Sequence, residues 1–563
     1  MLDVIARSHR GRTCKLLSDS MAISTPFVVQ SFDGKSDLPV FIEKGDLRRL
    51  WAFGEPVDLD FDLRKSYSSK GRGERRESKK VLLMALPWFD EPISDDIEIV
   101  IVTNGFELRR DPRRLIDLVV ELREKIGYNR LLGIFGIADP SILSLLIYMG
   151  VDVFDDSFVK GAGAMGIETM SEGALITKDD PTGTNVEELL RECNKASRFI
   201  EAGRLRELVD QRAPSSPTSV ALLRLFDKNG YSYQEEACPV VGSKFTCNTP
   251  QSLRRADIAR YQSRIAERYS KPSHKRVLLL LPCSAKKPYH TSKSHKAFSS
   301  AIHTASHDAL VHEVIVTSPL GIVPRELDVF FPADSYDIPV TGEWSFDEKE
   351  MIDRMARLIH SQGYDKVVCH LGDDYELVKG LGEMTCTVID DDGTSFESLK
   401  NLDLVLRQVT KGMDVPDYQV DRKESMRSIL RFQFGAEVAD SLLDGGYVLG
   451  KFPYWKIMRD SENGEKTQMG MLTPERQMAS LTLEGAECLK DAGLNCVEMT
   501  DFEIKGNLFA VGVVSADERI RIGDDVAIIL NGKVEAVGVA MMSGREMVQL
   551  RRGIAVKVRH KRK

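Results

Sequence analysis

The sequence predicts a multidomain α/β protein, and three observations support that prediction. The chain has 563 residues, which at roughly 150 residues per domain corresponds to three or four domains. Hydrophobic residues make up 42% and charged residues 29%, which is ordinary for a globular protein and excludes a disordered chain, a collagen-like chain and a coiled-coil rod. Apolar runs of strand length alternate with amphipathic helical patterns, which is typical of parallel β-α-β units.

The first 270 residues repeat one order of elements, a strand and then a helix. Runs of strand length occupy 81–86, 97–103 and 131–136, and residues 111–127 place apolar side chains at helical spacing. About 250 residues of this alternation is the size of a (β/α)8 barrel, so we expect such a barrel over residues 1–270. Functional side chains of these barrels lie at the carboxyl ends of the strands.

Three further segments follow the predicted barrel. A new buried strand starts at residue 277, and we expect a central α/β domain over residues 275–412. Residues 413–488 have a mixed pattern, and we assign them to a small α+β domain. Residues 489–563 contain short alternating strands punctuated by Gly and Asp, which predicts a C-terminal β-barrel.

The composition also bears on the compartment. Nine cysteines at irregular spacing do not form a disulfide framework, which indicates a reducing environment. No apolar run approaches the roughly 18 residues of a membrane span, and the N-terminus lacks the apolar core of a signal peptide. We therefore expect a cytoplasmic protein without membrane contact.

Two segments are basic although the formal net charge is −8. Residues 64–80 form either a solvated loop or a loop that contacts phosphate. The strongly basic C-terminus is either a solvated tail or an RNA-binding strand, because alternation puts Lys557 and Arg559 on one face. The candidate RNA-binding residues are Arg552, Lys557, Arg559 and Lys561.

The densest group of reactive side chains follows the strand that begins at residue 277. Cys283 is a nucleophile if a nearby cation lowers its pKa, and partial burial would let Lys287 act as an amine or as a proton donor. Ser292 and His295 share a face of a helical turn. A solvated loop rich in Lys and Ser is the alternative, because no spacing here is a metal or triad signature.

Two later strands end in similar clusters. Residues 316–344 begin at the end of an apolar strand, and residues 366–370 are followed by the acidic stretch LGDDYE. Each cluster alone is consistent with a turn, but three at adjacent strand ends predict a pocket. The polar and aromatic side chains of the first cluster include Arg325, Glu326, Tyr336, Asp337 and Trp344.

The motif after residue 281 resembles the signature of the archaeosine synthase family, archaeal tRNA-modifying enzymes related to the tRNA-guanine transglycosylases. Seven identities keep the fixed spacing of Pro-Cys, three residues, Lys-Pro-Tyr, two residues, Ser, two residues and His. Residues 103–115 and 150–157 are similar to the transglycosylase-like barrel, and the stretches TSPLGIVPRELD and YDIPVTGEW to the central domain of the family. Residues 479–489 with 511–563 resemble a pre-PUA segment and a PUA RNA-binding domain, so the resemblance covers nearly the whole chain.

The resemblance implies an enzyme that acts on tRNA carrying preQ0, a 7-cyano-7-deazaguanine base, at position 15 of the D-arm. It adds an amine to the nitrile and so builds the amidine of archaeosine or a precursor. Lysine is the favoured donor, with glutamine or ammonia as alternatives, and the lysine version requires a radical-SAM partner enzyme. A homodimer is a further expectation, because barrel relatives often dimerise.

The resemblance also suggests roles for the site residues. Lys287 or His295 can protonate the nitrile nitrogen, and Ser292 completes the catalytic candidates. Cys283 either adds to the nitrile as a covalent thioimide or only packs while the amine attacks directly. The candidate substrate-binding residues are Pro288, Tyr289, Arg325, Tyr336, Asp337, Phe154 and Asp155.

The sequence departs from the transglycosylase pattern at two places. The Asp-Ser-Gly-Gly-Phe-Gln stretch is absent, and only Asp155 occupies the position of a carboxylate nucleophile, which favours a relic or base-binding role. The zinc pattern is absent too; Cys238 and Cys247 are weak zinc candidates, and two buried structural cysteines are the alternative. The hypotheses that compete with nitrile modification are therefore a base-exchanging transglycosylase and a non-catalytic tRNA-binding subunit.

Overall fold

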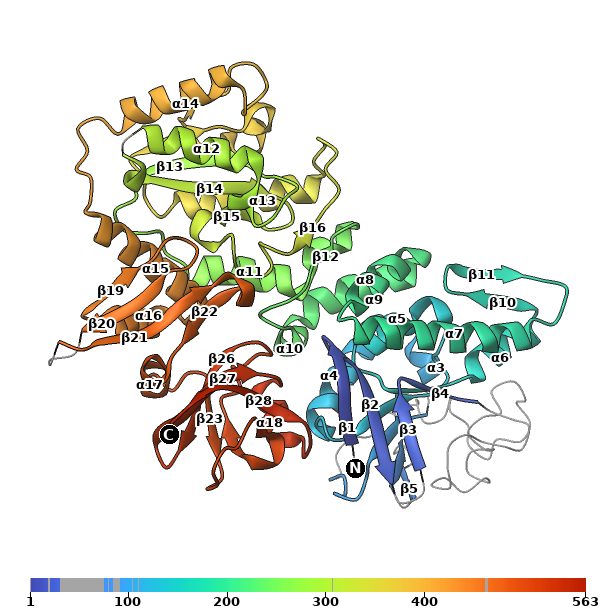
Figure 1. The fold of residues 1–563 in the computed structure, drawn as a ribbon. Coiled ribbons are helices and arrows are strands. Elements are labelled where there is room, and N and C mark those ends of the chain that lie inside the picture. Colours follow the sequence, from blue (N-terminus) through green and yellow to red (C-terminus); the bar gives the residue numbers. More distant parts are fainter. Residues whose placement is uncertain are drawn as a thin grey trace. The chain divides into compact units, whose positions relative to one another are not determined.

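A computed structural model of the chain describes residues 2–18, 21–30, 75–78, 80–84, 92–103, 105–109, 111–305, 307–460 and 464–562 (Figure 1). It divides into two compact units. The first comprises Met1–Cys238, Phe509–Gly512 and Arg545–Ala555, and the second Pro239–Leu508, Val513–Gly544 and Val556–Lys563. The first unit holds most of the expected barrel with two short pieces of the expected C-terminal domain, and the second unit holds the rest, so the bounds of those domains stay predictions.

The first unit is built on a sheet of parallel strands. Within the described residues this sheet has six strands, and all neighbours are parallel except the antiparallel pair β5–β6. The first parallel strand of the chain, β4, pairs with the last, β9, and β4 and β5 are the outer strands of the sheet as described. The strands are, in spatial order, β4 (Phe27–Val29), β9 (Val153–Asp155), β8 (Leu131–Ile134), β7 (Ile99–Val102), β6 (Val81–Met84) and β5 (Arg75–Ser78).

Two antiparallel additions to this unit were not foreseen from the sequence. One is a three-stranded sheet of β1 (Leu2–Ser8), β2 (Gly11–Ser18) and β3 (Met21–Thr25). The other is a hairpin of β10 (Ile167–Met170) and β11 (Gly173–Ile176).

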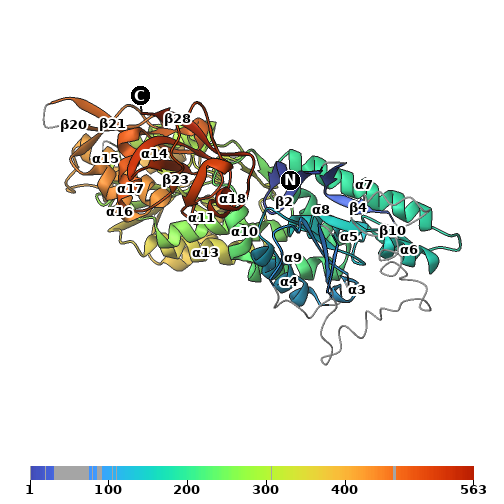
Figure 2. The same cartoon turned by 90° about the horizontal axis from the view of Figure 1, so that it is seen from below.

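Helices follow the strands of the first unit in the predicted rhythm. The helix expected over residues 111–127 is α4, capped by the Asp111 carboxylate, which accepts a hydrogen bond from Arg114 N at 3.1 Å. Helix α7 packs along α5 and α8 (Figure 2). The helices are α3 (Gly105–Leu108), α4 (Pro112–Ile126), α5 (Pro140–Tyr148), α6 (Ser157–Ala164), α7 (Thr182–Glu201), α8 (Leu205–Arg212), α9 (Pro217–Asn229) and α10 (Tyr231–Ala237).

The second unit contains the sheet that holds the motif. Its order is β15 (Gly321–Pro324), β14 (Val311–Thr317), β13 (Val277–Pro282), β17 (Lys366–Cys369) and β18 (Thr385–Cys386). Strands β14 and β17 both run parallel to β13. The carboxyl ends of these three strands therefore meet at one edge of the sheet.

Helices cover both faces of this central sheet (Figure 1). Leu279 and Leu281 of β13 pack with residues of α12 (Lys293–Thr304) and α14 (Phe396–Val409). The alternate residues Leu278 and Leu280 belong to the core that includes α11 (Ala256–Glu267), α13 (Phe346–His360) and α15 (Tyr418–Phe434). Burial on both faces explains why the β13 sequence is a continuous apolar run.

Two smaller sheets complete the second unit. An antiparallel sheet follows α15 and α16 (Ala436–Leu443), with the strands β19 (Gly446–Leu449), β20 (Lys456–Asp460), β21 (Lys466–Thr473) and β22 (Met478–Leu481). Helix α17 (Leu483–Asp491) leads into the C-terminal sheet. The short helix α18 (Gly544–Gln549) connects the last two strands of that sheet along the chain. The order of that sheet is β24 (Leu508–Phe509), β28 (Ile554–Lys561), β27 (Lys533–Ala540), β26 (Asp525–Leu530), β23 (Cys496–Met499) and β25 (Val513–Ala516).

Among the described residues, no helix is both long enough and apolar enough to cross a membrane.

Candidate active site

The motif begins where β13 ends and runs into helix α12. Ser292 is the N-cap of α12, because its hydroxyl oxygen accepts a hydrogen bond from His295 N at 3.2 Å. Pro288 shapes the preceding turn, and its carbonyl oxygen accepts hydrogen bonds from the backbone and the hydroxyl of Thr291. The cap explains the Ser-x-x-His spacing, and it gives Ser292 a structural task in place of a free hydroxyl.

Cys283 and Lys287 lie close enough to change each other's proton affinity. Burial raises the pKa of the half-buried Cys283 thiol, whereas Lys287 and the Thr317 hydroxyl lower it. Burial lowers the pKa of Lys287, and Cys283 and Asp337 oppose that shift. The Lys287 Nζ atom is 4.1 Å from the centre of the Tyr336 ring. The two residues predicted to react therefore influence each other, and the pKa of each is shifted in the direction that favours its neutral form.

A cluster of buried hydroxyl groups lies beside this pair. The Thr317 Oγ1 atom, at the end of β14, is 3.2 Å from the Tyr289 hydroxyl and 2.5 Å from the Tyr336 hydroxyl, and the two phenols also contact each other. Burial raises the pKa of both phenols, which therefore stay protonated at neutral pH. Tyr289 and Tyr336 were predicted from the sequence, but Thr317 was missed as a site residue. Its position at the end of a strand next to β13 is the signal that could have identified it.

Arg325 interacts with His295, the last residue of the motif. The Arg325 Nη2 atom donates a hydrogen bond to His295 Nδ1 at 2.7 Å, and the guanidinium also pairs with Glu313 and Asp328. Burial, with a smaller contribution from Arg325, lowers the pKa of His295 to about 3. His295 is therefore neutral at physiological pH. Its packing 5.2 Å from the Tyr289 ring favours a positioning role over the predicted proton donation.

The end of β17 supplies a carboxylate to the same edge. The Trp344 indole nitrogen donates a hydrogen bond to Asp374 Oδ1 at 2.7 Å, and both side chains are half-buried. Asp374 raises the pKa of Cys283, so the two side chains are electrostatically coupled. The three parallel strands thus contribute a thiol, a hydroxyl and a carboxylate to one edge, and the pocket expected there from the three clusters stays a prediction.

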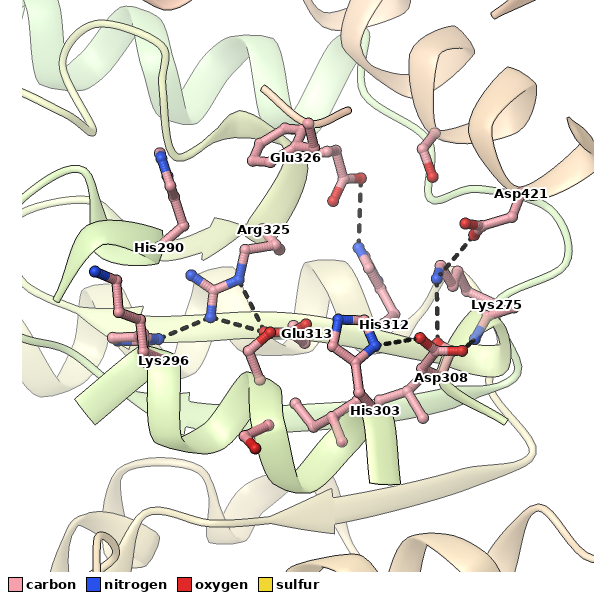
Figure 3. A pocket seen from close by; sticks show the side chains of 18 of the residues that line it. Lys275, His290, Lys296, His303, Asp308, His312, Glu313, Arg325, Glu326 and Asp421 are labelled. Carbon is pink, nitrogen blue, oxygen red and sulfur yellow. Dashed lines mark hydrogen bonds and ion pairs between the residues drawn. The ribbon is translucent and has the colours of Figure 1, made fainter. Parts of the chain in front are cut away.

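A cavity of about 730 Å³ lies beside α12 and does not include Cys283 or Lys287 (Figure 3). His295 and Arg325 line its wall. Most of its charged side chains already have partners, and the view shows them turned toward one another. The ion pairs are Arg325 with Glu313, His303 with Asp308, Lys275 with Asp421 and His312 with Glu326.

The substrate-binding candidates of the first unit are both buried. Phe154 is fully enclosed in the hydrophobic core, where it cannot touch a substrate without rearrangement. Asp155 ends β9, and its carboxylate accepts a hydrogen bond from Gly136 N at 2.6 Å. Burial raises the pKa of Asp155 to about 6, against hydrogen bonds from Ser157 and Gly136. The nearby TNGFE stretch is only partly described, since Asn104 lies outside the described residues.

The candidate RNA-binding residues divide into two kinds. Arg552 and Lys557 are exposed. Arg559 instead donates a hydrogen bond to the buried Asp525 carboxylate at 2.6 Å, and Lys561 donates one to Ile504 O at 2.8 Å. The strand pattern located the basic strand, but the inward turn of Arg559 could not be predicted without knowing the position of Asp525.

Two further predictions stay open. Cys238 and Cys247 are both buried but belong to different units, and each has an interaction within the protein, so zinc stays a prediction. Most of the basic segment at residues 64–80 lies outside the described residues.

Comparison with known proteins relates this geometry to a family. A model described as "Domain of unknown function (DUF5591)" matches residues 258–406, and a PUA domain model matches residues 498–562, which confirms the predicted PUA domain.

Three relatives span most of the chain. The archaeosine synthase subunit alpha of Thermoplasma acidophilum is 33% identical over 472 residues, covering 83% of this chain and 89% of the relative. The archaeosine synthase of Haloferax volcanii is 32% identical over 483 residues, covering 80% of each. A tRNA-guanine(15) transglycosylase of Methanobrevibacter smithii is 23% identical over 489 residues, covering 79% of this chain and 69% of the relative. The chain therefore belongs to the archaeosine synthase family.

Proposed function

We propose that this tRNA-modifying enzyme adds a nitrogen donor to the nitrile of preQ0 at position 15 of tRNA and thereby forms an amidine. The observation that supports this most directly is the electrostatic coupling between the Cys283 thiol and the Lys287 amine at the carboxyl edge of the central sheet. A nitrile needs a nucleophile at its carbon and a proton at its nitrogen. The thiol and the amine, which influence each other electrostatically, would provide the two.

The geometry suits a covalent route. Burial lowers the pKa of Lys287 and so favours its neutral amine, the form that would take the proton from the Cys283 thiol. The thiolate then bonds to the nitrile carbon, and Lys287 passes that proton to the nitrile nitrogen. The product is a neutral thioimidate on Cys283, with every atom of the thiol and nitrile retained.

The hydroxyl cluster supports the same assignment. The Tyr289, Tyr336 and Thr317 hydroxyls are protonated donors next to the sulfur, and their positions are fixed by burial. Fixed donors in a partly dry site stabilise developing charge without reorganising. They would assist the sulfur and the nitrile nitrogen as charge moves between them.

The amine that completes the reaction is lysine in this proposal, with glutamine and ammonia as the alternatives. The PUA domain binds the tRNA, with Arg552 and Lys557 as the exposed basic candidates for phosphate contact. The first unit recognises the base or the tRNA, and Asp155 is its candidate contact.

The test uses purified protein, preQ0-containing tRNA and isotopically heavy lysine, with parallel glutamine and ammonium reactions. Digested nucleosides are weighed by mass spectrometry for the wild type, Lys287→Ala and the matched control Lys286→Ala, which alters an exposed neighbour. We expect a heavy adduct in the wild type and in Lys286→Ala, and none in Lys287→Ala. Tight tRNA binding with no mass change from any donor would leave a binding subunit as the function.

A further inference from the structure

The second half of the reaction has a requirement that the first half does not have. An amine donor such as lysine or ammonium is protonated at neutral pH and has no lone pair with which to attack. Lys287 gives its proton to the nitrile nitrogen in the first step and is then neutral again, so the second step needs an acceptor for the further proton that the ammonium group brings. A carboxylate near the sulfur would meet this need.

Asp374 is placed for that task by the strand register. Leu280 of β13 is aligned with Cys369 of β17, and His370 N donates a hydrogen bond to Leu280 O at 2.9 Å. The two chains therefore leave the sheet side by side, with Cys283 three residues beyond Leu280 and Asp374 five residues beyond Cys369.

The carboxylate of Asp374 is oriented and partly open. Trp344 occupies Oδ1, while Oδ2 accepts no hydrogen bond from the part of the chain that the structure describes. Asp374 also makes no ion pair within that part, unlike the acids of the neighbouring cavity. The adjacent Asp373 is exposed, which makes it a suitable comparison.

We propose that Asp374, held by Trp344, is the catalytic base that takes a proton from the ammonium group of the amine donor; this rests on the function proposed above. The neutral amine then bonds to the thioimidate carbon and the carbon–sulfur bond breaks. The proton held by Asp374 passes to the departing Cys283 sulfur. The products are a protonated amidine, a thiol and the original carboxylate, so atoms and charge balance.

The groups that face Asp374 determine how it titrates. Burial raises the pKa of Asp374, and Asp373 raises it further, whereas the hydrogen bond from Trp344 lowers it. Cys283 is the titratable neighbour on the β13 side. Since the base must be ionised, the rate rises as pH increases through this pKa. Trp344→Phe should move that rise to higher pH, and Asp373→Asn should move it to lower pH.

The experiment compares amines that need a base with one that does not. Wild type, Asp374→Asn and Asp373→Asn react with preQ0-tRNA and either lysine, ammonium or methoxyamine, a weakly basic amine that is unprotonated at neutral pH. With lysine or ammonium, Asp374→Asn should be slower by about 10²–10⁴-fold, the range for a positioned general base. With methoxyamine it should react nearly as fast as wild type, and Asp373→Asn should match wild type with every amine at pH values above the pKa of Asp374.

The outcomes separate this inference from the proposed function. Equal loss of the lysine and methoxyamine reactions in Asp374→Asn would mean a structural role and would overturn the inference. An unchanged lysine rate would overturn it as well. Failure of the wild type with every amine would instead refute the proposed function itself, and the base role with it. Formation of the Cys283 adduct without donor in Asp374→Asn verifies that the variant is folded and binds tRNA.

Discussion

In each unit, parallel strands end at an edge of the sheet where a carboxylate lies. The surroundings of that carboxylate differ between the two units. In the first unit, Asp155 is 2% exposed and is hydrogen-bonded to the backbone of Gly136. In the second unit, Asp374 is half-buried and raises the pKa of Cys283, whereas Lys287 lowers it. Burial raises the pKa of both carboxyls. A shifted pKa alone therefore does not mark a reactive group; a free oxygen and a reactive neighbour do.

This contrast fits the departure of the chain from the transglycosylase pattern. Base exchange at a sugar uses a carboxylate nucleophile, and Asp155 is the candidate for it at a strand edge of the first unit. Amine addition to a nitrile needs a nucleophile, an acid and a base, and the central sheet brings together Cys283, Lys287 and Asp374. The four predictions below test this division of labour, from the largest expected effect to the smallest.

Cys283→Ser should reduce amidine formation to background, because a serine hydroxyl is far less acidic than a thiol and cannot form the thioimidate. The substitution preserves the shape of the side chain, so tRNA affinity should be unchanged. Product is measured by nucleoside mass spectrometry and affinity by a filter-binding titration. Retained product formation would remove the thiol from the chemistry.

Thr317→Val should slow the reaction by about tenfold to a hundredfold, since loss of one buried hydrogen-bonding partner costs about 1–3 kcal/mol. The hydroxyl groups of Tyr289 and Tyr336 lose their shared partner, and so does Cys283. Thr317→Ser is the matched control, because it retains the hydroxyl. A rate that is equal in both variants would show that the hydroxyl cluster is only packing.

Asp155→Asn should weaken tRNA binding by less than about tenfold, a change of at most 1.4 kcal/mol, and should leave the rate from bound tRNA unchanged. The carboxylate is buried and already hydrogen-bonded, so it has little to offer a reacting atom. Single-turnover kinetics at saturating enzyme separate binding from chemistry. A collapse of the single-turnover rate would place chemistry in the first unit and break the comparison.

His295→Gln should flatten the dependence of stability on pH between about 3 and 6.5. The pKa of His295 is lower in the folded protein than in the unfolded chain, so the unfolded chain binds the extra proton. Stability from this group is therefore complete above pH 6.5 and is lost as pH falls toward 3. Thermal melting of the wild type and the variant across this interval measures the effect. An identical slope in both proteins would mean that His295 titrates normally.

The sequence predicted the main parts of the candidate site because they follow from local pattern. A continuous apolar strand locates β13, and the residues after it, Cys283 and Lys287, are presented at the edge of a parallel sheet. The contacts between strands were harder to predict. Thr317 and Asp374 were within quoted segments, but their roles depend on the register of β14 and β17 against β13, which local pattern does not determine.

Other differences have the same physical origin. Arg325 and Arg559 were predicted as ligand contacts because they are basic, yet each guanidinium is turned to a buried or half-buried carboxylate of the protein. A buried carboxylate must be paired, and its position in the fold decides which arginine pairs with it. Such partners are distant in sequence, as with Arg559 and Asp525, and no spacing rule identifies them.

The central claim is that Cys283 bonds to the nitrile carbon of preQ0 in tRNA. The most direct measurement incubates the enzyme with preQ0-tRNA and no amine donor, denatures the mixture and looks for a covalent protein–RNA complex. We expect a complex with the wild type and none with Cys283→Ser. When lysine is added, the wild-type complex should disappear and amidine product should be released. If the wild type forms amidine without a trapped complex, and Cys283→Ser is equally active, then Cys283 does not bond to the nitrile carbon.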